Sequence, residues 1–252
     1  MSDELPAGQE HPEEPGARLE CRGLSGGRGT TVVFRDLDLS VAAGSVLALL
    51  GPNGAGKSTL LLTLAGLLPA KGGEVSVAGT RLRGGSAVAA NQAGVVLVPD
   101  NRSLFMSLTV AENLDVARRR CGTSPRELLD LFPALEKRWR VNAGALSGGE
   151  QQMLAMARAL IQDPKVLFVD EMSMGLAPLI VATLFETVHQ IAGDHGAAVV
   201  LVEQHVKLAL EVADEAAVLN RGAVVLRGAA DELRADPQRL EHAYLGELEA
   251  AP

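Results

Sequence analysis

Aromatic residues and cysteines are scarce in this chain of 252 residues. Only 3% of the residues are Phe, Trp or Tyr, so the core must be built mainly from Leu, Val and Ala. The same scarcity argues against a surface that stacks nucleic-acid bases on aromatic rings. The two cysteines, Cys21 and Cys121, are far apart and form no CxxC pair. This pattern argues against a disulfide framework or a zinc site and favours two buried or idle thiols in a reducing compartment.

Basic residues are also outnumbered, because 23 Lys and Arg stand against 31 Asp and Glu, a net charge of −8. Five of the acids lie in the first 17 residues, which leaves 26 acids against 23 bases, or −3, for the rest. This balance provides no basic footprint for a nucleic acid, so we expect no nucleic-acid partner. Nucleotides remain possible ligands, since backbone amides alone can hold phosphates.

Long apolar runs are missing as well. A bilayer span needs about 20 mostly apolar residues, and the longest uncharged stretch, between Asp38 and Lys57, is interrupted by Gly, Pro and Asn. The N-terminus is acidic and rich in proline, the opposite of a basic, apolar signal peptide. We therefore expect a soluble, cytoplasmic protein with a disordered acidic tail at 1–17 and a short C-terminal tail at 247–252.

Segments with strand patterns alternate with helical ones, which predicts an α/β fold with a helical insertion. The segment at about 107–162 predicts helices, with start signals at Thr109, Ser124-Pro125 and Ser147. The segment 220–222 predicts the turn of a hairpin. The expected strands are 31–41, 45–50, 74–77, 166–169, 197–202, 216–219 and 223–226.

Residues 51–58 fit the pattern GxxxxGK[ST] between a predicted buried strand and a predicted helix at 57–65. Glycines let the backbone curl so that its N–H groups point inward, and the following helix N-terminus adds positive potential for phosphate. Lys57 can reach the β- and γ-phosphates and is predicted to assist catalysis there, and the Ser58 hydroxyl can ligate Mg²⁺. The predicted nucleotide contacts are Gly51, Pro52, Asn53, Gly54, Ala55, Gly56, Lys57, Ser58 and Thr59.

Two carboxylates follow the apolar strand at 166–169. Asp170 and Glu171 thereby reach the carboxyl edge of the sheet, where α/β proteins bind ligands. Asp170 is predicted to belong to the Mg²⁺ shell and Glu171 to act as general base on the attacking water. Alone, this segment is equally a strand that ends in solvated acids. A P-loop in the same sheet favours the catalytic interpretation.

A third motif begins a predicted helix at 146–153. Ser147 and Glu150 form a capping-box pattern, and two glycines between them bare the backbone amides. A second anion site is therefore predicted at Ser147, Gly148, Gly149 and Glu150. The alternative is an ordinary capped helix start.

In this order and at these distances, the three motifs resemble the nucleotide-binding subunits of ABC transporters over residues 19–246. Residues 51–58 match the Walker A motif, 146–151 the signature motif and 166–171 Walker B. The resemblance implies a P-loop NTPase (ABC ATPase) core with a mixed sheet and an N-terminal antiparallel β part. It further implies core segments at 18–106 and 163–246 around a helical subdomain at about 107–162. Finally, it implies a head-to-tail dimer with each ATP between the P-loop of one subunit and residues 147–149 of the other.

Further segments are similar to the ATPases of branched-chain amino-acid importers, namely 98–105, 108–114, 146–155, 175–178, 201–204 and 243–246. This likeness implies an ATP- and Mg²⁺-dependent subunit that powers import of hydrophobic amino acids or a related small solute. It implies a second ABC ATPase subunit, integral membrane permease chains that hold this chain at the inner face of the cell membrane and, indirectly, a solute-binding protein. Two alternatives are a soluble ABC ATPase acting on ribosomes or DNA and a weakly catalytic regulatory subunit.

Three positions depart from the common ABC pattern. Arg28 stands where most members place an aromatic ring over adenine; a guanidinium can also stack on a base, whereas an exposed Arg in a Gly-rich loop at 25–29 is the alternative. Asp100 replaces a glutamine in the loop that senses Mg²⁺, so it is predicted to join the metal shell. Gln204 occupies the register of the switch histidine, with His205 one residue later. Gln204 is predicted to orient water or contact the γ-phosphate, with His205 as a bystander.

Overall fold

The computed structural model describes residues 17–119 and 124–248. The predicted acidic tail at 1–17 lies outside the described residues except for Ala17, and so do Cys121 and residues 249–252 of the predicted C-terminal tail. Cys21 is buried, as predicted, and burial raises the pKa of its thiol to about 12.

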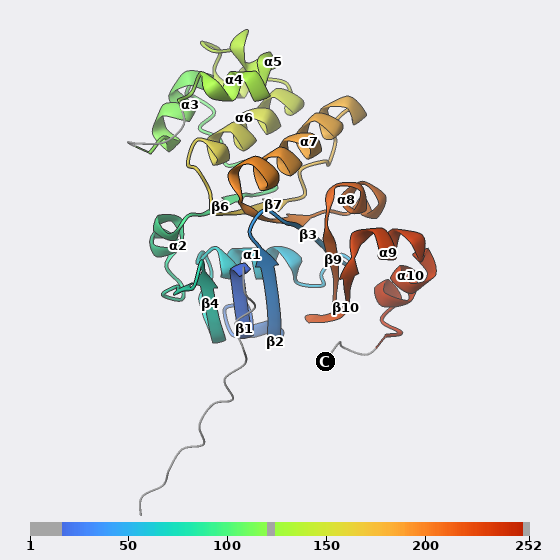
Figure 1. Ribbon diagram of the computed structural model, residues 1–252. Coiled ribbons are helices and arrows are strands. Elements are labelled where there is room, and N and C mark those ends of the chain that lie inside the picture. The colour runs from blue at the N-terminus through green and yellow to red at the C-terminus, as the bar shows by residue number, and fades with distance from the viewer. Residues whose placement is uncertain (1–16, 120–123, 249–252) are drawn as a thin grey trace, which may run out of the picture.

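Two β-sheets form the centre of the fold (Figure 1). The six-stranded sheet has the order β10-β9-β3-β8-β7-β6, parallel throughout except for the antiparallel β9–β10 hairpin. Its strands are β3 (Val46–Leu50), β6 (Val95–Val98), β7 (Val166–Asp170), β8 (Ala198–Val202), β9 (Glu215–Asn220) and β10 (Ala223–Ala229). The antiparallel four-stranded sheet has the order β2-β1-β4-β5, with β1 (Ala17–Arg28), β2 (Thr31–Ala42), β4 (Ala70–Val77) and β5 (Thr80–Arg81). The predicted mixed sheet, N-terminal antiparallel part and hairpin are thus confirmed.

Helices cover both faces of the six-stranded sheet, and α3 to α6 lie together beyond its β6–β7 side (Figure 1). The helices are α1 (Lys57–Leu64), α2 (Ala87–Ala93), α3 (Val110–Ala117), α4 (Glu127–Leu131), α5 (Pro133–Glu136), the 3₁₀ turn η1 (Ala143–Ala145), α6 (Gly148–Leu160), α7 (Pro178–His195), α8 (Val206–Val212), α9 (Ala230–Ala235) and α10 (Pro237–Leu245). Within the described ranges, no helix combines the length and apolarity needed to cross a bilayer. The division of the chain into a core and a helical subdomain stays a prediction.

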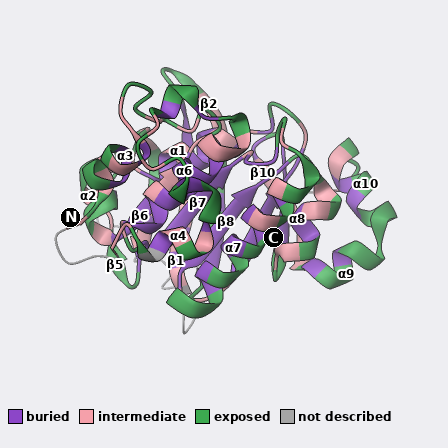
Figure 2. Ribbon diagram, turned by 90° about the horizontal axis from the view of Figure 1, so that it is seen from above, coloured by how far each residue is buried: buried purple, intermediate pink, exposed green. Residues whose placement is uncertain are grey.

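Strand β7 shows why the central strands are continuous apolar runs. All five of its residues are buried (Figure 2). Leu167 and Val169 pack into the cluster that contains α3, α6 and α7, whereas Val166 and Phe168 pack into the cluster that contains α1 and the four-stranded sheet. Because both faces are covered, alternation with polar residues would bury unpaired polar groups. The sheet therefore holds the carboxyl end of β7 rigidly.

The helix starts predicted at Thr109 and Ser147 are confirmed as capping boxes. Each hydroxyl accepts from the backbone N–H three residues later, and the Glu at that position accepts back from the cap residue. The predicted start at Ser124 is wrong in one respect, because α4 begins at Glu127 and Pro125 lies before its first turn. The first hydrogen bond of that turn runs from Leu129 N–H to the carbonyl of residue 126, so the proline stays outside it.

The predicted Gly-rich loop at 25–29 is also wrong, since β1 continues to Arg28 and pairs with Thr31 at its end. A Cβ on Gly26 would lie 2.4 Å from the ring of Phe34, and one on Gly27 would lie 1.9 Å from the Thr31 carbonyl oxygen. These glycines therefore permit close packing between two strands rather than a turn. For a similar reason the strand predicted at 74–77 starts earlier, at Ala70, where Lys and Gly hide the strand pattern.

Candidate functional site

The P-loop connects the carboxyl end of β3 to α1, as the sequence predicts. Gly51 has φ 141°, and a Cβ there would lie 2.0 Å from the Leu219 carbonyl oxygen on β9, so no side chain fits. Gly54 and Gly56 also have positive φ values, 80° and 111°, and Gly56 forms the N-cap of α1 without any side-chain cap. The first N–H groups of α1 are thus open to an anion, which fits a phosphate cradle.

Lys57 is the first residue of α1 and folds back over the loop. Its Nζ donates to the carbonyl oxygens of Gly51 at 2.7 Å and Pro52 at 3.1 Å, and only 5% of the residue is exposed. Burial lowers the pKa of the ammonium, while the nearby Glu171 and Asp170 act in the opposite direction. The positive charge of Lys57 is therefore held at the loop, next to the carboxylates of Asp170 and Glu171.

Asp170 ends β7 and is 6% exposed. Its Oδ1 is buried and has no hydrogen-bond partner among the described residues, while the Ser58 hydroxyl hydrogen-bonds the same carboxylate. Burial is the main cause that raises the pKa of Asp170; the charges of Glu171 and Asp100 add to it, and the Ser58 hydrogen bond opposes it. The structure thus brings the two predicted metal ligands together around an oxygen that lacks a partner.

This pair fits Mg²⁺, which takes oxygen ligands and is commonly held by one or two protein groups plus phosphates and water. Among residues 17–119 and 124–248, no group of three or more His, Cys, Asp or Glu side chains is arranged to hold a metal by itself. A hydroxyl and a carboxylate beside a phosphate cradle are therefore the expected protein share of a Mg²⁺–nucleotide site.

Glu171 follows directly and has a left-handed backbone, with φ 48°. Its N–H donates to the Val202 carbonyl oxygen of β8 at 2.9 Å. Glu171 and Asp100 line a cavity of about 380 Å³ together with Asn101, Arg102, Gln152 and Met174. Asp100 itself is exposed and accepts from the Asn101 N–H at 2.8 Å. The structure therefore places Asp100 on the Glu171 side of the site, and no hydrogen bond joins it to Ser58 among the described residues.

The three residues after β8 have different surroundings. Glu203 is buried and accepts two hydrogen bonds from Ser173, although the sequence assigned it no role. Gln204 is exposed. His205 is exposed too, but it lines an apolar groove of about 650 Å³ between α7 and α8. No predicted phosphate or metal ligand lines that groove. His205 therefore faces a different space from Glu171 and Asp100, which line the cavity of about 380 Å³.

The signature segment starts α6 with its polar groups already paired. The Ser147 hydroxyl and N–H both donate to Glu150 Oε2, and Arg138 Nε donates to Glu150 Oε1 at 2.8 Å. The Arg138 hydrogen bond, followed by that of the Ser147 backbone, lowers the pKa of Glu150. Gly148 is exposed, and a Cβ there would meet nothing closer than 3.7 Å. The Ser147 and Glu150 amides are used within the cap, so the backbone amides of Gly148 and Gly149, rather than the Glu150 carboxylate, are available to an anion.

Signature segment and P-loop do not meet within one chain. Helix α6 packs on one face of the six-stranded sheet, with α3 and α7, whereas α1 packs on the other face against the four-stranded sheet. Arg28 lies on that second side, exposed at the tip of the β1–β2 hairpin. Two residues beyond its pairing partner Thr31, the Val33 side chain lies 2.9 Å from the place of a Cβ on Gly56. The hairpin tip therefore adjoins the P-loop.

Comparison with known proteins agrees with this geometry. The family model described as ABC transporter matches residues 34–174. The chain is 40% identical over 223 residues to the high-affinity branched-chain amino acid transport ATP-binding protein BraG of Pseudomonas aeruginosa, covering 86% of this chain and 95% of that protein. This chain belongs to the ABC transporter family. It is therefore an ABC ATPase, which binds ATP and couples its hydrolysis to transport.

Other members of the family are similar over most of their length. The chain is 35% identical to the probable branched-chain amino acid transport ATP-binding protein LivF of Archaeoglobus fulgidus, covering 83% of this chain and 91% of that one. A solved structure titled as an ATP binding subunit of an ABC transporter superposes with a TM-score of 0.77 at 29% identity. It covers 90% of this chain and 98% of its own. The predicted ABC ATPase fold is thus confirmed.

This ABC ATPase has one further residue at its P-loop that the sequence did not single out. The Gly51 N–H donates to Tyr244 Oη on α10 at 3.0 Å, across 193 residues of the chain. Asn220 Nδ2 in turn donates to the carbonyls of Ala243 and Tyr244 and fixes this helix end. The only sequence signal was the likeness of 243–246 to importer ATPases, which gave no role to the tyrosine.

Replacing Tyr244 with Phe is expected to destabilise the protein moderately. The Gly51 N–H would lose its acceptor, at a cost of about 1 kcal/mol, so the melting temperature should fall by roughly 2–4 °C for a domain of this size. Thermal unfolding followed by calorimetry measures this shift. Gln238→Ala, an exposed change on the same helix, is the matched control. An equal shift for both variants would contradict a role for the tyrosine hydroxyl.

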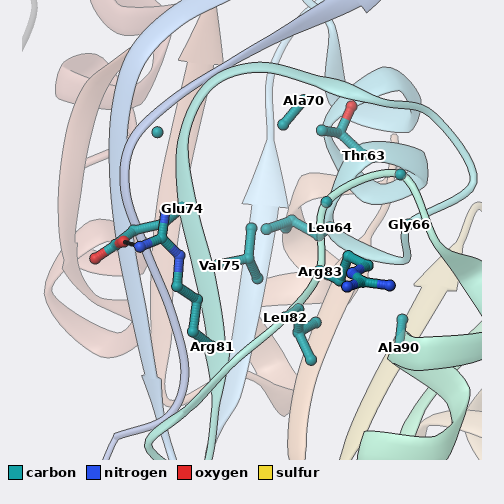
Figure 3. Close-up of a pocket in the computed structure, with 13 residues that line it drawn as sticks. Thr63, Leu64, Gly66, Ala70, Glu74, Val75, Arg81, Leu82, Arg83 and Ala90 are labelled. Atoms are coloured by element: carbon teal, nitrogen blue, oxygen red, sulfur yellow. Dashed lines mark ion pairs between the residues drawn. The ribbon is translucent and has the colours of Figure 1, made fainter.

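A separate pocket of about 220 Å³ lies near the C-terminal end of α1, between this helix, β4, β5 and α2 (Figure 3). Thr63 and Leu64 contribute from α1, and Arg81 at its rim forms an ion pair with Glu74 at 2.9 Å. None of the residues predicted for ATP or Mg²⁺ lines this pocket. It is therefore distinct from the nucleotide site of the ABC ATPase.

Proposed function

We propose that this chain is the ATP-hydrolysing subunit of an ABC importer for branched-chain or other hydrophobic amino acids, or a related small solute. The main structural support for ATP hydrolysis is the buried Asp170 carboxylate, which is hydrogen-bonded to P-loop Ser58 and followed by Glu171. The choice of solute is supported by BraG and LivF, both named for branched-chain amino acid transport. In such an importer the permease, and not the ATPase, would contact the cargo and set the specificity.

Residues 51–59 would surround the phosphates of ATP, which would be held by the open N–H groups at the start of α1 and by the Lys57 ammonium. Ser58 and Asp170, with Asp100 beside Glu171, would hold Mg²⁺. The bound cation would neutralise negative charge that develops on the phosphate oxygens during transfer. Arg28, at the hairpin tip next to the P-loop, would stack on the adenine.

Glu171 would act as the general base. It would take a proton from a water molecule as that oxygen forms its bond to the γ-phosphorus, while the bond to the bridging oxygen of ADP breaks. Gln204 would orient this water or donate to the γ-phosphate. Gln204 is exposed two residues after the end of β8, the strand whose Val202 carbonyl accepts the Glu171 N–H.

Completion of the site would require a second ABC ATPase subunit, either another copy of this chain or a sister subunit. Within one chain, the signature turn at Ser147, Gly148 and Gly149 lies on the opposite sheet face from the P-loop. Its open amides would bind the γ-phosphate held by the partner, with Glu150 as the cap that orders the turn. Closure of this dimer on ATP would then drive a membrane permease, to which a solute-binding protein would deliver the solute. This chain would lie at the inner face of the membrane.

Replacement of Gln204 by Ala is expected to slow hydrolysis by about 10-fold, because poorly oriented reactants lose rates of this order or more. His205→Ala is the control, and it should stay within about twofold since His205 lines the groove between α7 and α8. Phosphate release at saturating ATP measures both. The reverse order would show that the switch position lies at residue 205.

Purification of the tagged chain from its native membranes in mild detergent tests the transport proposal. Mass spectrometry of the copurified proteins should find a multi-span permease, with or without a sister ATPase. An untagged strain processed in parallel is the control for carry-over. Ribosomal or DNA-repair proteins without any membrane partner would overturn the importer proposal and leave the ATPase chemistry in place.

A further inference from the structure

Glu203 is a buried acid outside the predicted catalytic set. It is 1% exposed, and both of its oxygens bind one residue: Oε1 accepts from the Ser173 N–H at 3.0 Å and Oε2 from the Ser173 hydroxyl at 2.7 Å. None of the ion pairs in the described part of the chain involves Glu203. Glutamates are rarely buried this completely unless they are paired. The side chain is therefore committed to holding Ser173.

Ser173 lies two residues after Glu171, on the segment that leaves β7. Strands β7 and β8 are parallel neighbours, with Asp170 opposite Val202. Two successive ties therefore run from the segment after β7 to the end of β8: Glu171 N–H to the Val202 carbonyl at 2.9 Å, and Ser173 to Glu203. One hydrogen bond lies at the Glu171 N–H and the other lies two residues later, so the backbone is fixed both before and after the Glu171 side chain.

The turn needs such support because Glu171 has φ 48°, a conformation that costs a non-glycine residue energy and persists only where the surroundings enforce it. Loss of one tie would let the backbone relax. The direction of the Glu171 carboxylate would then change, since the side chain follows its own backbone. The same tie also fixes the end of β8, next to Gln204.

We propose that Glu203 is a positioning residue for ATP hydrolysis, which holds Ser173 and thereby aims the Glu171 carboxylate. The proposal rests on the role of Glu171 given above. Glu203 does not take the proton itself, because both of its oxygens are engaged and the residue is sealed from solvent. Its effect is on the rate of the chemical step and not on the binding of ATP by the P-loop.

The test compares Ser173→Ala, Glu203→Gln and Ser173→Thr in the full chain. Removal of the Ser173 hydroxyl should lower kcat about 10-fold, the order expected when a reacting group is misplaced, with KM for ATP within about twofold. Glu203→Gln keeps one acceptor and should fall between this variant and the wild type. Ser173→Thr keeps the hydroxyl and should restore kcat. Thr183→Ala, which removes a hydroxyl that donates to the Leu179 carbonyl on α7, is the matched control.

Hydrogen exchange on the nucleotide-free protein supplies a second readout that does not depend on hydrolysis. The amides of Glu171 and Ser173 should exchange faster in Ser173→Ala than in the wild type or in Thr183→Ala. Unchanged exchange together with unchanged kcat would overturn the proposal, as would a rise in KM equal to the fall in kcat. If Glu171→Gln hydrolysed ATP normally, the proposed role of Glu171 as general base would be wrong. Faster exchange in Ser173→Ala would still support the structural part of the proposal, that Glu203 holds Ser173 in place.

Discussion

The Glu171→Gln variant should bind ATP normally and hydrolyse it at least about 100-fold more slowly than the wild type, the usual contribution of a general base. Glutamine has the same shape, so the Glu171 backbone tie to β8 and the packing of β7 should remain. It lacks a basic oxygen that can take the proton from water. Phosphate release at saturating ATP and a separate nucleotide-binding titration measure the two effects.

The matched control for this change is Glu186→Gln, which alters an exposed glutamate on α7. It should hydrolyse ATP like the wild type. Size-exclusion chromatography with ATP adds a further comparison, because an arrested subunit should accumulate as the closed dimer with its partner. Turnover of Glu171→Gln within twofold of the wild type would exclude the residue as the base.

The chemistry-bearing motifs are visible in the sequence because their signals are local. The P-loop needs only glycines between an apolar strand and a helix, and the acids at 170 and 171 need only a buried strand before them. The capping boxes at Thr109 and Ser147 are equally local, since each closes within three residues. In all these cases the residues that cause the structure are adjacent in the chain.

The residues that hold these motifs in place are not visible in the same way. Tyr244 supports the P-loop across 193 residues, and Glu203 holds Ser173 across 30. Gly26 and Gly27 resemble loop residues until the strand that packs on them is known. Such contacts depend on which strands become neighbours, and a single sequence does not state that pairing. The proposed contact of Ser147 with a partner's P-loop is not visible within one chain either, because α6 and α1 lie on opposite faces of the sheet.

Replacing Asp170 with Asn should stabilise the nucleotide-free protein while it removes hydrolysis. The wild-type carboxylate is buried, and its Oδ1 has no partner, so the folded state bears the cost of an incompletely paired charge. Asparagine is neutral and can still hydrogen-bond the Ser58 hydroxyl. We expect a gain of about 1–2 kcal/mol in the free energy of unfolding, and a melting temperature higher by roughly 2–8 °C.

The same substitution should cost about 100-fold or more in hydrolysis, because an amide is a poor ligand for the cation that neutralises charge at the phosphates. Addition of Mg²⁺ to the ATP-bound protein should therefore raise the melting temperature of the wild type and leave that of Asp170→Asn unchanged. Asp194→Asn, an exposed change near the end of α7, is the control for a general effect of charge. A lower melting temperature for Asp170→Asn would mean that the carboxylate stabilises the fold. Retained Mg²⁺ stabilisation would move the metal ligand elsewhere. The combined result, greater stability with lost activity, is expected only if the unpaired oxygen is kept in the fold for the metal.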